Sequence, residues 1–364
     1  MHDVVVVGAG PSGSFAAAEA AKNGANVLVY EEHNHVGVPV QCAGLVSKSG
    51  LDSLGIDYRK SVLNEMIGAN IFSPSGNLIV AKAREVKACV IDREVFDTLV
   101  FDMAERTGAK FIFGKRVKKS DVMNGKRVIC ADGAYSLLAR EVGFPEIREY
   151  VCCAQAEFEY ANIERNFVEV YLSRRDFPGF FGWVIPVNEN EARVGLGVRL
   201  GLKVHEYFER FIRMLEQKEK IKRGKMKKLG GGCIPMCMRE ITATDKVALV
   251  GDAAGQVKAT TGGGVFFGSS CGMIAGRVAA SGESMLVYEK EWRRAYMRDI
   301  SLHYRLRDFI NSLDDASVER YFTMAKALGI EQFLTNFGEM DRVSAMVESL
   351  KGNPLYSLMP PFLR

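Results

Sequence analysis

The stretch DVVVVGAGPSGSFAAAEAAKNGANVLVYEE, residues 3–32, decides the fold of this chain. It begins with a short β-branched run typical of a buried parallel strand, and the alanine-rich segment from Ser14 to Asn23 is typical of a helix. Gly24 ends that helix, and a second apolar run, Val27–Tyr30, predicts the next strand. The stretch therefore predicts a complete βαβ unit, the opening of a Rossmann-like parallel sheet.

The glycine-rich turn between the first strand and the helix, GAGPSG, has the spacing of a dinucleotide-binding motif. Gly8 permits the tight turn, Gly10 lets a pyrophosphate approach the backbone, and Gly13 lets the helix pack closely on the strand. The free N–H groups and partial positive charge of the helix N-terminus favour phosphate. Glu31, 18 residues beyond the last glycine, would accept hydrogen bonds from the adenosine ribose. The acid at this distance favours nucleotide binding over a purely structural βαβ unit.

The composition is that of a globular protein, with 48% hydrophobic and 25% charged residues in a chain of 364. The net charge of +4 is too small to indicate nucleic-acid binding. The chain runs directly into its first strand and holds no segment of about 20 strongly apolar residues, so we expect neither a signal peptide nor a membrane span. Its eight cysteines show neither a CxxC pair nor the Cys/His spacing of a zinc site. These features predict a cytoplasmic protein without a metal site.

The sequence leaves the role of some cysteines and of one basic cluster open. Cysteines in strand-like runs are expected to be small core residues: Cys89, Cys152 and Cys153. Cys233 and Cys237 flank Pro235 in an expected loop, as separate thiols or as a disulfide. The cluster Lys218–Lys228 holds seven Lys or Arg residues and one Glu, which fits a solvated helix end or, alternatively, contact with an anionic lipid surface.

Beyond the opening unit, the pattern changes to strands that predict a second, antiparallel sheet. Such runs include Phe167–Leu172 and Ala192–Val198, and a hairpin is expected over Ala69–Val80. Helices are expected over 93–107 and 204–222. We therefore predict an α/β fold, α+β overall, in three parts: a Rossmann-like cofactor-binding domain (1–66, 83–149 and 238–283), an antiparallel-sheet substrate domain (67–82 and 150–237) and a helical C-terminal region (284–364).

Three further segments resemble those of the flavoprotein family that includes p-hydroxybenzoate hydroxylase-like monooxygenases and geranylgeranyl reductases. Cys130–Ser136, CADGAYS, followed by Arg140, is similar to the ADGxxS segment of that family, and Val250–Gly255, VGDAAG, is similar to its GDAA segment. Arg93 in IDREVFD resembles the family arginine at the start of the helix that lines the cofactor. The resemblance covers most of the chain and implies that the nucleotide is FAD, with Asp252 on the flavin ribityl chain.

The residues around the GDAA segment suit that role. Asp252, at the end of a strand, can accept hydrogen bonds from the hydroxyls of an extended sugar alcohol. A helix that starts near Thr261–Gly264 aims free N–H groups at the pyrimidine edge of an isoalloxazine and stabilises the negative charge of reduced flavin. Glycines recur every four residues along this helix: Gly264, Gly268, Gly272 and Gly276. They favour close packing on the alanine-rich first helix over a GxxxG contact in a membrane.

Within that family, three stretches resemble the geranylgeranyl reductase branch, which includes digeranylgeranylglycerophospholipid reductases: PVQCAGLVS (39–47), ATTGGGVFFG (259–268) and PGFFGWVIPV (178–187). The last is similar to a P-G-x-Y-x-W-x-F-P-K motif of that branch, but Phe181, Ile185 and Val187 replace its tyrosine, phenylalanine and lysine. Gln41 likewise stands where many members carry arginine. These departures make the expected pocket more apolar and leave the head group of the substrate open.

The motifs and the resemblance together give a set of expected site residues. The family places the 37–47 loop beside the isoalloxazine, so Cys42 is the candidate that donates a proton or holds the alkene, with simple packing as the alternative. The expected substrate contacts are Phe181, Trp183, Pro186 and Phe266, and Phe177, Phe180 and Phe267 are further candidates for the wall of a tunnel. The residues expected to bind FAD are Gly8, Gly10, Pro11, Ser12, Gly13, Glu31, Glu32, Cys42, Ala43, Gly44, Arg93, Asp132, Gly133, Gly251, Asp252, Gly262, Gly263 and Gly264.

We therefore expect an FAD-dependent oxidoreductase that saturates C=C bonds of isoprenoid (geranylgeranyl) chains, with archaeal-type diether lipids as the expected substrates. Only one Rossmann fingerprint is present, so the electron donor, ferredoxin or NAD(P)H, is expected to dock transiently. Peripheral contact with a membrane follows from such a substrate, and no nucleic-acid partner is expected. The alternatives are an aromatic hydroxylase of the same fold and a non-catalytic flavin electron carrier. An iron–sulfur quinone oxidoreductase is disfavoured because no cysteine follows Cys271.

Overall fold

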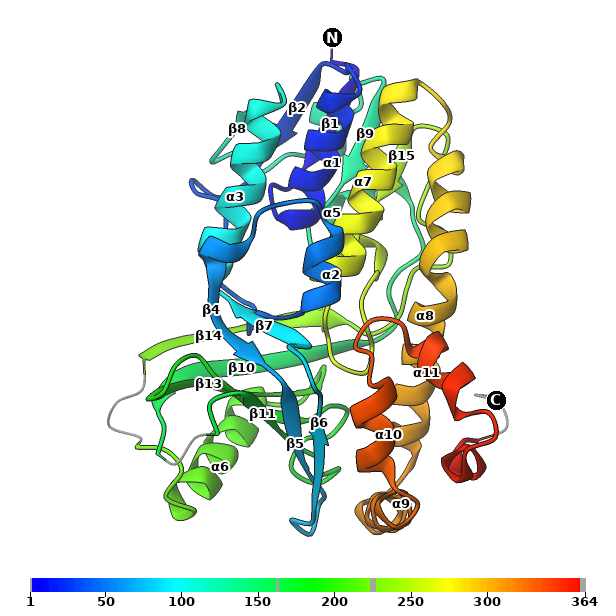
Figure 1. Ribbon diagram of the computed structural model, residues 1–364. Coiled ribbons are helices and arrows are strands. Elements are labelled where there is room, and N and C mark those ends of the chain that lie inside the picture. The colour runs from blue at the N-terminus through cyan, green and yellow to red at the C-terminus, as the bar shows by residue number, and fades with distance from the viewer. Residues whose placement is uncertain (1, 162–163, 223–226, 361–364) are drawn as a thin grey trace.

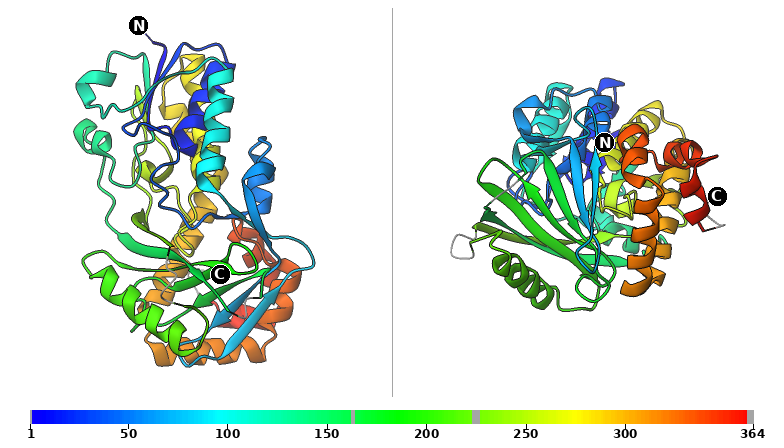
Figure 2. Two further views of the ribbon diagram at one scale, coloured as in Figure 1. Left: turned by 90° about the vertical axis from the view of Figure 1, so that its left-hand side faces the viewer. Right: turned by 60° about the horizontal axis from the view of Figure 1, so that its bottom comes forward.

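The structure is a computed structural model that describes residues 2–161, 164–222 and 227–360. One sheet lies near the N-terminus and a second, larger sheet lies at the other end of the molecule (Figure 1). A long helix, α8 (Leu286–Ser312), runs from beside the first sheet toward the second (Figures 1 and 2). The space between the two sheets is where the loops that carry the expected site meet.

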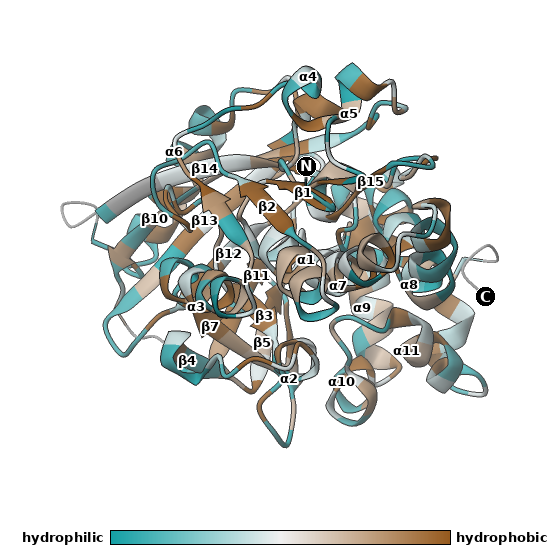
Figure 3. Cartoon of the chain, turned by 90° about the horizontal axis from the view of Figure 1, so that it is seen from above, coloured by the Kyte–Doolittle hydropathy of each residue, from teal (hydrophilic) through white to brown (hydrophobic). Residues whose placement is uncertain are grey.

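The first sheet consists of five parallel strands in the order β15-β9-β1-β2-β8. Its strands are β1 (Val4–Val7), β2 (Val27–Tyr30), β8 (Lys110–Ile112), β9 (Arg127–Cys130) and β15 (Val247–Leu249). Helices α1 (Pro11–Lys22), α3 (Arg93–Arg106) and α7 (Val265–Ser281) cover one face, and α4 (Lys119–Val122) and α5 (Leu137–Val142) cover the other (Figure 3). Because both faces are covered, β1 and β2 are buried throughout, which explains their continuous apolar sequence. The predicted Rossmann-like sheet is confirmed.

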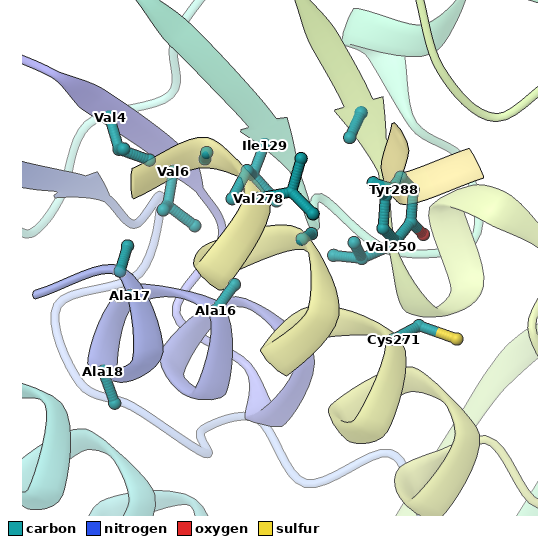
Figure 4. Close-up of a cluster of buried hydrophobic side chains, with 14 of the residues drawn as sticks. Val4, Val6, Ala16, Ala17, Ala18, Ile129, Val250, Cys271, Val278 and Tyr288 are labelled. Atoms are coloured by element: carbon teal, nitrogen blue, oxygen red, sulfur yellow. The ribbon is translucent and has the colours of Figure 1, made fainter. Parts of the chain in front are cut away.

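Helices α1 and α7 cross in direct backbone contact at the centre of this layer (Figure 4). A methyl group built on Gly272 would lie 2.2 Å from Ser12 O, and one built on Gly276 would lie 2.2 Å from Ala16 O. No side chain fits at either position, so the helices can approach this closely only because both residues are glycine. The glycine ridge thus packs against the alanine-rich first helix, as the sequence predicted.

The second sheet has seven strands in the order β14-β10-β13-β12-β11-β5-β6. They are β5 (Gly68–Phe72), β6 (Leu78–Lys82), β10 (Tyr150–Glu159), β11 (Phe167–Tyr171), β12 (Gly182–Pro186), β13 (Glu191–Arg199) and β14 (Lys227–Pro235). Adjacent strands are antiparallel except β11 and β5, which pair in parallel, so the sheet is mixed rather than purely antiparallel. The exception arises because the predicted β5–β6 hairpin comes from a distant part of the chain and joins β11 without a hairpin connection. Helix α6 (Val204–Gln217) covers the face opposite the first sheet.

A small third sheet, not predicted, connects these two layers. It contains β3 (Leu45–Ser47), β7 (Ala88–Ile91) and β4 (Val62–Met66) in antiparallel order β3-β7-β4, and the short helix α2 (Lys48–Ser53) follows β3. The last residues of the expected 37–47 loop therefore form a strand. Such a strand is too short to show periodicity, and its partner lies more than forty residues away in sequence.

The C-terminal region is helical, as predicted. After α8 come α9 (Asp315–Ala327), α10 (Ile330–Phe337) and α11 (Val343–Leu350), which lie beside the second sheet (Figures 1 and 2). Among the described residues, no helix combines the length and the apolar character that crossing a bilayer requires.

Two details differ from the sequence prediction. The helix expected over 204–222 ends at Gln217, and Lys220 and Lys227 of the basic cluster pair with Glu169 and Glu191, while residues 223–226 lie outside the described residues. Cys233 lies in strand β14 rather than in a loop. Its neighbour across the sheet is a cysteine of β10, and not Cys237.

Replacing Gly276 by alanine tests the α1–α7 contact. The added methyl group meets backbone atoms that no rotamer change can move, so we expect the free energy of unfolding to fall by roughly 2–3 kcal/mol, although alanine is the better helix former by about 1 kcal/mol. Arg277→Ala, on the exposed side of the same helix, removes only an exposed ion pair with Glu291 and is expected to cost less than about 1 kcal/mol. Urea unfolding measures both, and equal losses would contradict the packing account.

Candidate active site

The first part of the site is the turn between β1 and α1. Gly8 has a φ of +95°, and a methyl group on it would lie 2.3 Å from Ala131 O, which follows β9. Gly13, in the first turn of α1, approaches Gly8 O so closely that a methyl group would lie 1.9 Å from it. Both positions therefore require glycine. Gly10 precedes α1 and leaves the helix N-terminus without a capping side chain or an acidic residue in its first turn, which suits a phosphate.

Glu31 lies directly beside this turn. Ala9 N donates to Glu31 Oε2 at 2.7 Å, and His33 N donates to Glu31 Oε1 at 2.9 Å, so the carboxylate is held at the end of β2. Glu32 is exposed instead, with Oε2 3.5 Å from Arg116 Nε. The structure therefore places Glu31 with the glycine turn and Glu32 on the surface away from it.

The second part of the site follows β15. Residues Gly251–Ala254 form a 3₁₀ turn, and a methyl group on Gly264, which precedes α7, would lie 2.9 Å from Asp252 Oδ1. A methyl group on Gly251 would lie 2.5 Å from Ser12 Oγ, so the two parts of the site meet at the N-terminus of α1, where Pro11 and Ser12 lie. Burial raises the pKa of Asp252 to about 6, an effect that the Arg93 guanidinium opposes. No side-chain hydrogen bond of Asp252 is found in the described part of the chain.

Asp132 has a different environment. Its carboxylate accepts from Ser136 Oγ at 2.6 Å and from Leu138 N at 3.2 Å, so it is bonded to the first turn of α5. Burial raises its pKa, and these hydrogen bonds oppose the shift. Gly133, at a φ of +77°, forms the turn between β9 and that helix. Both residues lie at the carboxyl edge of the parallel sheet, but the Asp132 carboxylate already accepts hydrogen bonds from Ser136 and Leu138.

The Cys42 loop, residues 37–47, lies over the start of α3. The Cys42 sulfur accepts from Gly44 N at 3.3 Å and lies near the Arg93 guanidinium, on which it acts electrostatically. Arg93 is fixed by two 2.9 Å hydrogen bonds to Asp97, one turn along α3. The guanidinium also acts electrostatically on Asp252, so a single cation is close to both the thiol and the carboxylate.

A buried arginine that the sequence prediction missed holds the loop on the second sheet. Arg193 of β13 donates through Nη1 to Ala43 O at 2.9 Å and to Ile91 O at 3.1 Å, and its Nε pairs with Glu157 Oε1 at 3.2 Å. A methyl group on Gly44 would lie 2.5 Å from Arg193 Nη1, so the loop needs glycine there. The only sequence signal is one arginine within the otherwise apolar run 192–198 of β13.

Aromatic side chains of the PGFFGWVIPV stretch form a cluster on the second sheet. Phe180 and Phe181 stack with ring centroids 4.2 Å apart, and Trp183 lies 5.9 Å from Phe181. Phe180, Phe181, Cys153 of β10 and the loop residues Ala43 and Leu45 all pack against one buried hydrophobic core that includes Trp183 and Ile185. Gly262, at a φ of +74°, lies against this cluster, since a methyl group on it would lie 3.3 Å from Phe180 Cζ. The structure thus brings Phe181 and Trp183 together with the loop and the glycines that precede α7.

Other expected substrate residues lie elsewhere. Pro186 is on the face of β12 opposite Trp183, because side chains alternate along a strand. Phe177 packs edge-on against Phe211 of α6, with centroids 5.1 Å apart, on that same opposite face. Phe266 and Phe267 pack against Tyr296 of α8 within the core of the first sheet. The structure therefore places these four residues away from Phe181 and Trp183, and their expected contact with substrate stays a prediction.

The sequence prediction also missed a buried polar network beside the glycines that precede α7. Lys258 Nζ lies 2.7 Å from Asp341 Oδ1, with both side chains almost fully buried, and Ser47 at the end of β3 hydrogen-bonds to the same carboxylate. The Lys258 side chain passes next to Gly263, where a methyl group would lie 2.6 Å from Cε. Beside it, burial and the Lys258 charge lower the pKa of His303 to about 4. Asp341 thus ties the C-terminal region to the loops of the site.

Comparisons with known proteins agree with this geometry. Residues 3–138 match the family of FAD dependent oxidoreductases, and residues 149–233 match the geranylgeranyl reductase catalytic domain. The digeranylgeranylglycerophospholipid reductase of Methanocaldococcus jannaschii is 32% identical over 361 residues, which cover 90% of this chain and 91% of that protein. The chain belongs to the geranylgeranyl reductase family.

Further relatives support the assignment. The digeranylgeranylglycerophospholipid reductase of Methanothrix thermoacetophila is 32% identical over 355 residues, covering 87% of this chain and 90% of the relative. A solved structure of a geranylgeranyl bacteriochlorophyll reductase-like protein from Thermoplasma acidophilum superposes with a TM-score of 0.83 at 24% identity, over 98% of this chain and 99% of that one, and shows the same fold. The protein is an FAD-dependent oxidoreductase, and the glycine turn, the uncapped α1 N-terminus and the unpaired Asp252 carboxylate fit that cofactor.

Asp252→Asn tests the site at its ribityl end. Desolvation of the ionised carboxylate outweighs its attraction to Arg93, so the apoprotein should lose stability as the pH rises from about 4 through 6, relative to the variant, and the two should agree near pH 4. Loss of hydrogen bonds to a charged acceptor should weaken FAD binding roughly 10- to 100-fold. Urea unfolding against pH and titration of FAD fluorescence measure the two effects. Unchanged FAD affinity would remove Asp252 from the site.

The Lys258–Asp341 pair is tested by breaking it in two ways. Asp341→Asn leaves a buried ammonium without its counter-charge and is expected to lower the free energy of unfolding by about 3–5 kcal/mol. The double variant Lys258→Met, Asp341→Leu removes both charges and should lose much less. Arg298→Ala, which breaks an exposed pair with Glu348, serves as the control at under about 1 kcal/mol. A double variant as unstable as Asp341→Asn would contradict the pairing.

Proposed function

We propose that this protein saturates C=C bonds of geranylgeranyl chains, with archaeal-type diether lipids as substrates. The observation that carries the proposal is that the Cys42 loop and the aromatic side chains Phe181 and Trp183 belong to one hydrophobic core, near Arg93 and the glycines that precede α7. A thiol that can supply a proton and an apolar surface that can hold a hydrophobic alkene thus lie in the same part of the molecule. The names of the relatives, digeranylgeranylglycerophospholipid reductases, supply the lipid class.

Bound FAD, once reduced, supplies the hydride for one alkene carbon. The protein must supply a proton for the other carbon and hold the chain still. Cys42 is the proposed proton donor, because its thiol lies near Arg93 on a loop that shares a hydrophobic core with Phe181 and Trp183. Protonation of the less substituted carbon places the developing positive charge on a tertiary carbon, so the substrate itself stabilises that charge. Phe181 and Trp183 are proposed to hold the alkene against the loop.

The departures from the family motif support an apolar substrate segment at this surface. Phe181 stacks on Phe180, and Ile185 is buried in the same aromatic cluster, where a tyrosine and a phenylalanine stand in the motif. Because Phe181 replaces the tyrosine of the motif, this position carries no hydroxyl group toward the proposed isoprenoid substrate. The electron donor, ferredoxin or NAD(P)H, is proposed to dock transiently, and contact with a membrane is proposed to be peripheral.

The test is anaerobic incubation of the dithionite-reduced, FAD-bound protein with digeranylgeranylglycerophospholipid, followed by mass spectrometry of the lipid. We expect a gain of two hydrogens for each double bond reduced. Cys42→Ser should retain FAD and lose roughly 100-fold or more in rate, because the hydroxyl is a far weaker acid than the thiol. Cys237→Ser removes a thiol outside the cluster and is expected to leave the rate unchanged.

Two outcomes would contradict parts of this proposal. Oxygenated product formed only in air would indicate an aromatic-hydroxylase type of chemistry instead of reduction. A Cys42→Ser variant that saturates the lipid at the unaltered rate, with FAD bound, would show that the thiol is not the proton donor while leaving the reductase assignment standing.

A further inference from the structure

Two thiols of neighbouring strands face each other at the edge of the second sheet. Cys152 of β10 and Cys233 of β14 are directly opposite in the antiparallel register, and their sulfur atoms are 2.7 Å apart. Directly opposite residues have Cα atoms about 4.5–5.5 Å apart, within the range of about 4.4–6.8 Å that a disulfide spans. A bond of about 2.05 Å therefore requires only a small movement of the side chains. The proposed reductase chemistry does not use this pair.

The surroundings of the pair make it accessible to a small reagent. Both cysteines are partly exposed, and the exposed Tyr135 stacks on Tyr150 beside them, with its hydroxyl within hydrogen-bonding reach of Cys233. Burial and the hydrogen bond with Cys233 raise the pKa of Cys152 to about 12. Because the two sulfur atoms are adjacent, either thiol can attack first and the other then completes the bridge.

We propose that Cys152 and Cys233 form a redox-active dithiol that low-molecular-weight disulfides oxidise to a disulfide across β10 and β14. One of the two thiols, as its thiolate, attacks one sulfur of the reagent, RSSR, forming a mixed disulfide and releasing RS⁻. The other thiol then loses its proton, attacks the protein sulfur of that mixed disulfide and displaces the second RS⁻. The protein loses two hydrogens and two electrons, and the reagent becomes two RSH molecules.

The bond would act on the strand that lies beneath the Cys42 loop. β14 is an edge strand with β10 as its neighbour in the sheet. A methyl group on Gly232, adjacent to Cys233, would lie 3.0 Å from Gln41 Oε1, and one on Gly230 would lie 3.3 Å from Val40 O. Oxidation therefore fixes the edge strand on which residues 40 and 41 rest. The dithiol thus couples the ratio of low-molecular-weight disulfides to thiols around the protein to the mobility of the loop that carries Cys42.

The experiment treats the FAD-bound protein with oxidised glutathione and measures the intact mass. We expect the wild-type chain to lose two hydrogens and a peptide map to join the peptides that hold Cys152 and Cys233. In Cys152→Ser the reaction should stop at the mixed disulfide, so the chain gains one glutathionyl group on Cys233. Cys153→Ser is the matched control: its sulfur lies on the opposite face of β10, in the aromatic cluster, and the bridge should form as in the wild type.

Hydrogen exchange of the Gly230–Gly232 amides provides the second readout. We expect exchange to slow roughly tenfold in the oxidised wild type and in oxidised Cys153→Ser, and to stay unchanged in Cys152→Ser. A wild-type mass that does not fall, a bridge to another cysteine, or loss of the bridge in Cys153→Ser would overturn the dithiol. A bridge that forms without slowing exchange would overturn the proposed coupling to the Cys42 loop.

Discussion

The arrangement of the site depends on the buried guanidinium of Arg193. It rises from β13 of the seven-stranded sheet, pairs with Glu157 of β10, and donates to Ala43 O of the Cys42 loop and to Ile91 O of the three-stranded sheet. A buried cation is stable only where charge and hydrogen bonds compensate for its lost hydration. That requirement fixes the loop on the substrate sheet, since moving Ala43 away would remove one of the acceptors of the buried guanidinium.

The opposite wall is fixed by contact between helices rather than by charge. Because Gly272 and Gly276 let α7 lie against the backbone of α1, the N-termini of both helices point toward the same space between the sheets. The Lys258–Asp341 pair then anchors the turn before α7 to the C-terminal region and, through Ser47, to the end of β3. Arg193 and Lys258 thus hold the two sides of the site, each through a buried ionic contact.

The sequence predicted the parts of this site that are local. The βαβ unit, the helix α3 that begins at Arg93 and the glycine ridge of α7 each carry their signal within about thirty residues, because close backbone approach demands glycine at fixed spacing. Arg193 and Asp341 were missed because their partners are distant in sequence, and an isolated charge has no periodicity. Cys233 was assigned to a loop with Cys237 because Pro235 suggested a turn, whereas pairing with β10 extends β14 up to that proline.

The central claim is that electrons from the bound cofactor reach an isoprenoid alkene held at the Cys42 loop. Its most direct test is stopped-flow absorbance of the flavin after the reduced protein is mixed, without oxygen, with a geranylgeranyl lipid. The account predicts that the oxidised-flavin absorbance appears at the rate at which the saturated product forms, and that a fully saturated lipid produces no change. Flavin that stays reduced in the presence of the unsaturated lipid, and is reoxidised only when oxygen is admitted, would contradict it.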